Sequence, residues 1–228
     1  MTQSRPADRL LSAALSHVPF DGWSDATLAA AALDCEIDLA EARALFPRGG
    51  VDLALAYHRA GDAAMAAELG RTPLDDLRFR EKVVKAVRLR LELADKEAVR
   101  RGATLFALPM HAGDGASALW GTVDRIWVAL GDTSQDLNWY TKRATLSGVY
   151  AATVLFWLGD DSTDHHATWE FLDRRIENVM QIEQVKAAVR KNRLLKPFLA
   201  LPDWAASKVR APARMPRADL PGSWTRPI

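Results

Sequence analysis

The chain has 228 residues, enough for one domain with a small appendage, and its 49% hydrophobic content is ordinary for a globular protein. A formal net charge of +1 gives no general reason to expect a nucleic-acid partner. The single Cys35 excludes an intrachain disulfide and argues against a cysteine-based metal site. We read no signal peptide at the N-terminus and no segment long enough to span a membrane, so any membrane contact is expected to be peripheral.

Apolar residues recur at helical spacing through almost the whole chain, and no segment shows a sustained alternation of apolar and polar residues. We therefore predict an all-α fold of about nine to ten helices. The first four helices are expected over residues 8–18, 24–33, 38–46 and 51–69, with Ser24 as an N-cap and Gly70 as the last stop. Two apolar stripes are expected to face inward: Leu11, Leu15 and Val18 on the first helix, and Leu53, Ala56, Ala60 and Ala64 on the fourth.

This opening, three short helices and a longer one entered through FPRGGVDL, resembles the helix-turn-helix of tetracycline-repressor-type regulators. A helix that approaches DNA phosphates normally carries Lys and Arg. The third helix instead offers Asp38 and Glu41 against Arg43 alone, and the turn before it adds Asp34 and Glu36. DNA would be repelled by such a face, so we expect a repurposed three-helix fold without nucleic-acid binding. A ligand-responsive regulator is the alternative function.

The middle of the chain is predicted to be a long charged helix, a short apolar helix and a third helix rich in tryptophan. The long helix is expected from residue 73 to 101, with its mixed charges on a solvated face. Gly102 then separates it from the short apolar helix ATLFALPM. The third helix, over 116–130, presents Leu119, Trp120, Val123, Ile126, Trp127 and Leu130.

Residues 136–161 form the stretch around which the chain is organised. No charged residue occurs from Ala144 to Gly159, and this part is too short for a membrane span, so we predict a helix buried on nearly all sides. The head before it joins two aromatic rings to two cations and is either a packed corner or a recognition surface. Its polar and aromatic residues are Asp136, Asn138, Trp139, Tyr140, Lys142 and Arg143.

The loop after this helix holds the strongest metal-ligand candidates of the chain. Carboxylates beside a histidine suit a divalent ion, but no second ligand element completes a site elsewhere. The same loop reads as a helix break in which Thr163 or Asp164 caps the next helix, whose inner face is Trp169, Leu172, Ile176 and Val179. The metal candidates are Asp160, Asp161, Asp164, His165, His166 and Glu170.

The C-terminal segment is basic, with nine Lys and Arg residues against one acid between residues 184 and 217. Interleaved apolar residues allow two readings, a peripheral membrane helix or a docked last helix with a solvated basic tail. Nucleic-acid binding by the same charges is a third reading. The candidate membrane-binding residues are Lys186, Arg190, Lys191, Arg193, Phe198 and Trp204.

One string gives the chain a specific likeness: D-x-N-W-Y-T-[KR]-R at residues 136–143, then an apolar helix ending in D-x-S-x-D and T-W-x-F-L-x-x-R. This string, together with LFPRGGVDL near the N-terminus, is similar to the accessory proteins of ubiquinone (coenzyme Q) biosynthesis called the Coq-nine family. The resemblance covers residues 8 to 195. It departs after Gln184, where prolines interrupt the segment. The absence of a transit peptide suits a bacterial form at the inner face of the cytoplasmic membrane.

The resemblance implies a tetracycline-repressor-like fold that has lost DNA binding, forms homodimers and binds isoprenoid lipids in an apolar cavity. It also implies association with the membrane and support of the di-iron demethoxyubiquinone hydroxylase, to which a quinone intermediate is presented. The expected domain plan is 1–70 for the helix-turn-helix-like part, 71–183 for the lipid-binding core, 184–207 for the basic amphipathic segment and 208–228 for a disordered tail. The implied hydroxylase-docking residues are Asp136, Trp139, Tyr140 and Arg143, with Ile126 and Trp127 beside them.

We therefore predict a non-enzymatic, lipid-binding accessory protein that needs no cofactor and has no catalytic residues. A hydrolytic or metal-dependent enzyme that uses His165 and Glu170 is a further hypothesis, although no nucleophile elbow, phosphate loop or dinucleotide fingerprint occurs. The lipid cavity is expected along the uncharged helix. Its predicted lining residues are Trp120, Val149, Phe156 and Leu158.

Overall fold

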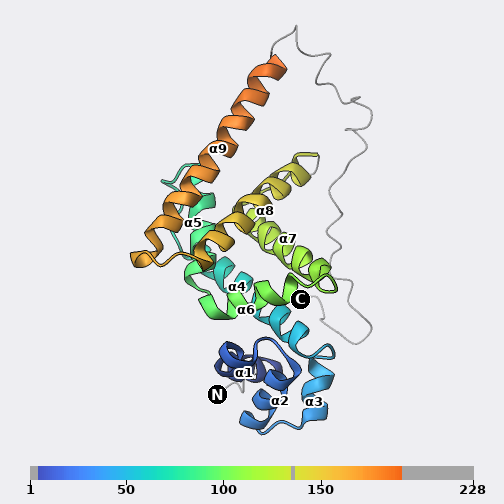
Figure 1. Ribbon diagram of the computed structural model, residues 1–228. Coiled ribbons are helices and arrows are strands. Elements are labelled where there is room, and N and C mark those ends of the chain that lie inside the picture. Colours follow the sequence, from blue (N-terminus) through green and yellow to red (C-terminus); the bar gives the residue numbers. More distant parts are fainter. Residues whose placement is uncertain (1–4, 135–136, 192–228) are drawn as a thin grey trace.

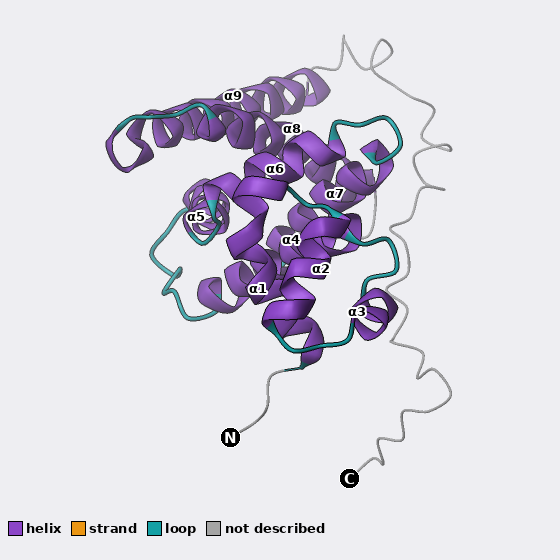
Figure 2. Cartoon of the chain, turned by 60° about the horizontal axis from the view of Figure 1, so that its bottom comes forward, coloured by secondary structure: helices purple, strands orange, loops and turns teal. Residues whose placement is uncertain are grey.

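The computed structural model describes residues 5–134 and 137–191, and within these the side chains of 137–138 and 180–191 are left out. All regular structure in the described residues is helical (Figure 2). The helices are α1 Pro6–Asp21, α2 Asp25–Asp34, α3 Leu39–Leu45, α4 Gly50–Leu69, α5 Phe79–Glu92, α6 Lys96–Phe106, α7 Ala112–Ala129, α8 Leu137–Leu158, the 3₁₀ turn η1 Thr163–His165, and α9 His166–Lys191.

Helices α1, α2 and α3 form a small unit at one end of the molecule (Figure 1). The predicted cap is confirmed, since the side chain of Ser24 accepts a bond from Thr27 N. Asp38, where the third helix was expected to start, caps α3 by accepting a bond from Ala40 N. The first helix was predicted over residues 8–18, but it continues through Pro19 to Asp21 and Gly22 is its C-cap. The fully buried face of α1 also differs from the predicted one and consists of Leu10, Ala14 and Val18.

Helix α4 leaves this unit and runs into the body of the molecule (Figure 1). Gly50 starts it against the Trp23 backbone, where an added Cβ would lie 2.3 Å from the Trp23 carbonyl oxygen. The predicted apolar stripe of this helix is confirmed at Leu53, which is buried, and wrong at Ala60 and Ala64, which are exposed. Its buried side instead includes Asp62, which can be buried because an arginine of α5 neutralises it.

The charged segment after α4 is two helices, so the prediction of one long helix from 73 to 101 was wrong. Helix α5 ends at Glu92, and Asp95 starts α6 by accepting a hydrogen bond from Ala98 N at 2.7 Å. Gly102 does not separate two helices as predicted, because it lies buried inside α6. Asp95, one of the acids of the charged face predicted to be solvated, is therefore the N-cap of α6.

Helices α7, α8 and α9 complete the body, and α9 extends well beyond it (Figure 1). The predicted inner face of α9 is confirmed at its centre, where Leu172 and Ile176 are buried. Helix α8 is not buried on nearly all sides, which corrects the prediction for residues 144–159. One side packs in the core through Leu146, Val149, Tyr150, Thr153 and Trp157, whereas Leu155 is 69% exposed.

The turn between α8 and α9 is capped by residues other than the two predicted. Asp160 accepts bonds from Ser162 N and Thr168 N, each at 2.9 Å, and Ser162 Oγ accepts one from Ala167 N. Asp164 and His165, in contrast, both have positive φ. Two turn residues before the helix thus supply the caps, and Thr163 and Asp164 do not.

Candidate ligand and partner site

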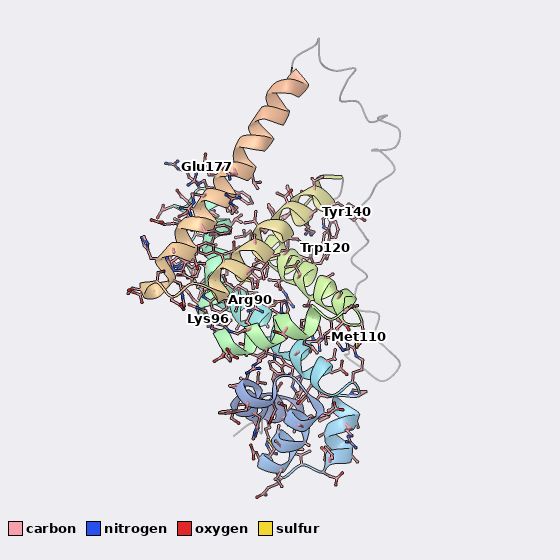
Figure 3. All side chains as sticks on the ribbon, in the orientation of Figure 1. Arg90, Lys96, Met110, Trp120, Tyr140 and Glu177 are labelled. Atoms are coloured by element: carbon pink, nitrogen blue, oxygen red, sulfur yellow. The ribbon has the colours of Figure 1, made fainter. Side chains whose placement is uncertain are left out.

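The start of α8 carries the aromatic head predicted from the sequence. Trp139 packs edge-on against Tyr140, with 4.7 Å between ring centroids, and meets Trp120 of α7 at 5.9 Å. All three residues are half-buried. Figure 3 shows Trp120 and Tyr140 near the end of the molecule where α7 and α8 meet. The three rings form a continuous aromatic surface from two helices, which we call the aromatic surface below.

Arg143 holds this surface in place from inside the protein. Its side chain is 0% exposed, and it bonds to Asp124 at 2.7 Å, to Asp132 at 3.0 Å and to the Trp139 carbonyl at 3.2 Å. Its guanidinium carbon also lies 4.1 Å from the centre of the Trp139 ring. Because the planar guanidinium engages all these groups at once, the ring of Trp139 has a fixed position.

Asp132, in the loop before α8, joins Arg143 to Lys142. Its carboxylate accepts bonds from Lys142 Nζ at 2.9 Å and from the Ser134 hydroxyl at 2.7 Å. Burial by itself raises the pKa of Asp132, but the bonds from Lys142, Ser134 and Arg143 outweigh burial and hold that pKa well below its usual value of 3.8. The carboxylate is therefore charged at any physiological pH.

The other predicted docking residues lie behind the aromatic surface or outside the described residues. Ile126 is fully buried and Trp127 is 8% exposed, both on the core side of α7. Asp136 lies outside the described residues. Of the six predicted residues, Trp139 and Tyr140 can therefore meet a partner directly, whereas Arg143, Ile126 and Trp127 support them.

An apolar cavity of about 300 Å³, called cavity 1 below, opens beside this surface. Lys142 lies on its rim, over the Trp127 ring at 5.4 Å, and Phe79 stacks on the same ring at 5.5 Å. Arg80 of α5 and Glu177 of α9 form an ion pair across its border. Cavity 1 is lined by Phe79, Arg80, Val83, Trp127, Thr141, Lys142, Thr145, Leu146, Val149, Ile176 and Val179.

Only one of the four predicted lipid-lining residues, Val149, lies in the wall of cavity 1. Trp120 belongs to the aromatic surface, and Phe156 stacks on Phe171 of α9 at 4.6 Å. Leu158 is half-buried at the end of α8. The sequence did not predict that α5 and α9 contribute to the cavity wall. The apolar spacing of Ile176 and Val179 nevertheless marked one side of α9 as an inner face.

The metal-ligand candidates after α8 do not form a metal site in the described residues. Asp160 is buried and occupied by capping bonds, which hold its pKa well below the usual 3.8. His166 and Glu170 are largely exposed and lie 3.6 Å apart. In the described part of the chain, no group of three or more His, Cys, Asp or Glu residues could hold a metal ion.

The predicted membrane residues fall outside the described side chains. Lys186, Arg190 and Lys191 lie on the last turns of α9, and Arg193, Phe198 and Trp204 lie beyond it. Within the described residues, no helix is both long enough and apolar enough to cross a membrane.

Comparison with protein families finds a relative for the central segment. Residues 112–183, which hold α7, α8 and most of α9, match the COQ9 family model. This segment of the chain is similar to the COQ9 family. The match includes the aromatic surface and most residues of the cavity 1 wall, and it agrees with the Coq-nine resemblance of the D-x-N-W-Y-T-[KR]-R string.

Curated COQ9 relatives extend the likeness to most of this chain. The mitochondrial ubiquinone biosynthesis protein COQ9 of Rattus norvegicus is 33% identical over 78% of this chain and 61% of the relative, and that of Xenopus tropicalis is 34% identical over 75% and 57%. The human protein is 31% identical over 78% of this chain and 60% of its own length. The chain thus spans about 60% of the length of the curated relatives it matches.

The fold is also similar to that of a solved structure. A TetR transcriptional regulator from Nitrosomonas europaea superposes with a TM-score of 0.60 over 75% of this chain and 95% of the regulator, at 18% sequence identity. This confirms the all-α, tetracycline-repressor-like architecture that the sequence predicted.

Proposed function

We propose that this protein is a non-enzymatic accessory protein of ubiquinone biosynthesis. In this proposal it binds an isoprenoid or quinone intermediate and presents it to the demethoxyubiquinone hydroxylase at the membrane surface. The COQ9 segment and the names of its relatives support the pathway. Cavity 1 and the aromatic surface support the parts of the proposal that concern lipid binding and partner binding.

The observation that carries the proposal is the adjacency of an apolar cavity and an aromatic surface on a single helix. Trp139 and Tyr140 form the surface, and Thr141, Lys142 and Thr145 of the next turn line cavity 1. A ligand that leaves this cavity emerges beside the aromatic surface. A partner bound there could receive the ligand without its exposure to water.

The chemistry of cavity 1 fits a prenyl chain better than a polar substrate. Apolar side chains provide most of its wall, and the two cations at the rim are already paired with Asp132 and Glu177. Each Å² of apolar ligand surface removed from water contributes about 25 cal/mol to binding. A volume of about 300 Å³ accommodates part of a polyisoprenoid tail and leaves the polar head at the rim.

The proposal includes a homodimer that acts in the cytoplasm at the inner face of the membrane. Support for a second copy comes from α8, where Leu155 and Phe156 remain exposed in the single chain. The basic segment 184–207 is proposed to attract anionic head groups. Liposome flotation of the full chain and of a chain ending at residue 183 tests this segment, because the shorter chain should no longer float.

The lipid part is tested by mass spectrometry of lipids extracted from the purified protein. We expect isoprenoid species in the wild type and their loss in Val149→Trp, which would fill cavity 1. The matched control Ala144→Trp changes an exposed residue of the same helix that lines neither cavity, and it should retain the lipid. Absence of any isoprenoid or other lipid from the wild type contradicts the cavity proposal.

The pathway part is tested by deletion of the gene in the native organism, followed by quinone analysis. Accumulation of demethoxyubiquinone is the expected result, because the hydroxylase would lose its supply of substrate. Unchanged ubiquinone with no accumulated intermediate contradicts the proposal.

A ligand-responsive transcription regulator is the second candidate, favoured by the TetR fold of the chain. The third helix argues against it, because Asp38 caps α3 and Glu41 lies in its first turn. Phosphate contacts make DNA binding strongly salt-dependent. A mobility-shift assay that shows no retardation of duplex DNA at low salt removes this candidate.

A further inference from the structure

A second cavity, of about 340 Å³, opens between the helices of the body and shares no lining residue with cavity 1. Five helices, α4 to α8, contribute to its wall, together with Trp23 from the start of the chain. Small residues such as Ala54, Gly102, Ala118 and Ala151 leave this space open. We call it cavity 2. Its volume lies at the lower end of the range for small-molecule sites.

A network of charged and polar groups borders cavity 2, and its charges cancel. Arg90 donates to Asp62 at 2.7 Å and to the His58 carbonyl at 3.1 Å, and the Thr122 hydroxyl donates to the same Asp62 at 2.9 Å. Figure 3 shows Arg90 in the middle of the body, far from Tyr140. Burial lowers the pKa of His58, so this histidine is neutral at pH 7. The cavity wall therefore carries no uncompensated charge, which disfavours an ionic ligand.

The hydroxyl of Tyr150 points to the presence of a polar group in the ligand. Tyr150 is 4% exposed and lines cavity 2, yet its hydroxyl makes no hydrogen bond to any residue that the structure describes. Tyr57, on the same wall, accepts a bond from Asp95 N at 2.8 Å and keeps its own proton for a further acceptor. The Tyr150 oxygen is not among the fully buried polar atoms of the described residues that have no partner, so it is reachable from the cavity and free to bond to a polar group of a bound molecule.

The remaining wall selects the shape of the ligand. Trp23 and Tyr57 lie together with 5.3 Å between their ring centroids, and Phe106 lines the cavity as well. Aromatic walls of this kind pack well against the face or edge of a planar ring.

We propose that cavity 2 is a second binding site, which takes a neutral planar ring compound with a hydroxyl or carbonyl oxygen, and that Tyr150 hydrogen-bonds to this oxygen. The site goes beyond the function proposed above, because its residues are separate from those that would hold a prenyl chain. Trp23 in its wall also links an occupied cavity 2 to the N-terminal unit, since its indole N–H donates to the Ala98 carbonyl at 2.9 Å.

Three probes of similar size distinguish the ligand classes: 2-naphthol, naphthalene and 2-naphthoate. Equilibrium dialysis against the full chain should show saturable binding of 2-naphthol, weaker binding of naphthalene and the weakest binding of the anionic naphthoate. In Tyr150→Phe, which removes one oxygen, the affinity for 2-naphthol should fall roughly three- to tenfold, the range expected for one hydrogen bond. The affinity for naphthalene should not change.

A matched pair of cavity-filling variants assigns the binding to its cavity. Ala151→Trp fills cavity 2 and should abolish binding of 2-naphthol, whereas Thr145→Trp fills cavity 1 and should leave it intact. Melting curves establish that each variant is folded, and if Ala151→Trp does not fold, Ala118→Leu takes its place. The proposal is overturned if wild type does not bind 2-naphthol, if naphthoate binds more tightly, or if Tyr150→Phe binds 2-naphthol as wild type does. Loss of lipid from Val149→Trp with retained 2-naphthol binding separates the two sites.

Discussion

Arg143 is the residue on which the order of the candidate site depends. A fully buried guanidinium is tolerated only when its charge is neutralised, and here two carboxylates, a carbonyl and an aromatic ring engage Arg143. Its Nε and Nη1 are bonded, whereas Nη2 has no hydrogen-bond partner among the described residues. Asp132 is the more buried of the two carboxylates, with a side chain that is 4% exposed against 37% for Asp124. The position of the aromatic surface therefore depends on Asp132, a residue in the loop before α8 that lies outside the surface itself.

We predict that Asp132→Asn lowers the free energy of unfolding by about 3 kcal/mol, because it leaves buried Arg143 with one partly exposed carboxylate. Urea denaturation at pH 7 measures this, with Asp161→Asn on an exposed turn residue as the control. The pKa of Asp132 is lowered in the folded protein, so its contribution is complete above pH 3.8 and is lost as the pH falls below that value. The difference between the two proteins should shrink there, and an equal stability at pH 7 would refute the assignment.

His58 gives a second prediction at the scale of single residues. Its folded-state pKa lies below the ordinary 6.5 because the ring is buried, so between these two values the unfolded chain binds a proton that the folded chain does not. The free energy of unfolding should therefore fall as the pH drops below 6.5, by at most about 1.4 kcal/mol per pH unit. Denaturation at pH 5.5 and 7.5 tests this. His58→Gln should remove that part of the pH dependence, and His166→Gln, at an exposed position, should keep it.

At the scale of elements, two helical glycines allow the same substitution to have opposite effects. At Gly50, the first residue of α4, a Cβ would lie 2.3 Å from the Trp23 carbonyl oxygen, a backbone atom that cannot rotate away. At Gly148 of α8 nothing lies within 4 Å of the added Cβ. We predict that Gly50→Ala lowers the melting temperature, whereas Gly148→Ala stabilises the protein by up to about 1 kcal/mol through helix propensity. Calorimetry of both variants tests this pair, and equal effects would contradict it.

The sequence predicted those elements whose signals are local. Ser24 caps α2 as expected, and the third helix begins near Asp38 as expected, because an N-cap acts on the backbone two or three residues further on. The break between α5 and α6 was missed, because no Gly or Pro marks it and Asp95 resembles any other surface acid. The buried side of α4 was missed because it contains Asp62, whose burial depends on Arg90, 28 positions later.

The candidate site was predictable to the same extent. The D-x-N-W-Y-T-[KR]-R string marked Trp139 and Tyr140, and the absence of charge marked α8 as a helix with a large apolar side. The cavity itself was not predictable, since Phe79 and Ile176 reach its wall from helices that lie far away in the sequence. Which apolar residues face a cavity and which face the core is decided by packing between helices, and no periodicity within one helix records it.

At the scale of the whole molecule, the TetR fold separates two ends with different surfaces. The N-terminal unit holds the acidic start of α3, and the aromatic surface lies where α7 and α8 meet, in the body that α4 reaches (Figure 1). Helix α8 connects cavity 1 on one side with cavity 2 on another, through Val149 and Tyr150. A ligand in either cavity thus contacts the helix that begins at the proposed docking surface.

This arrangement gives a prediction for the partner. Trp139→Lys should abolish co-purification with the demethoxyubiquinone hydroxylase, because it places a cation on the aromatic surface and removes the ring that Trp120 and Tyr140 contact. Phe20→Lys is the control, since Phe20 is 82% exposed on α1 in the N-terminal unit and should not affect binding. The fold should survive, because Arg143 keeps its two carboxylates when the Trp139 ring is lost. A large drop in melting temperature would mean that Trp139 is a core residue, and retained co-purification by a folded variant would place the hydroxylase elsewhere.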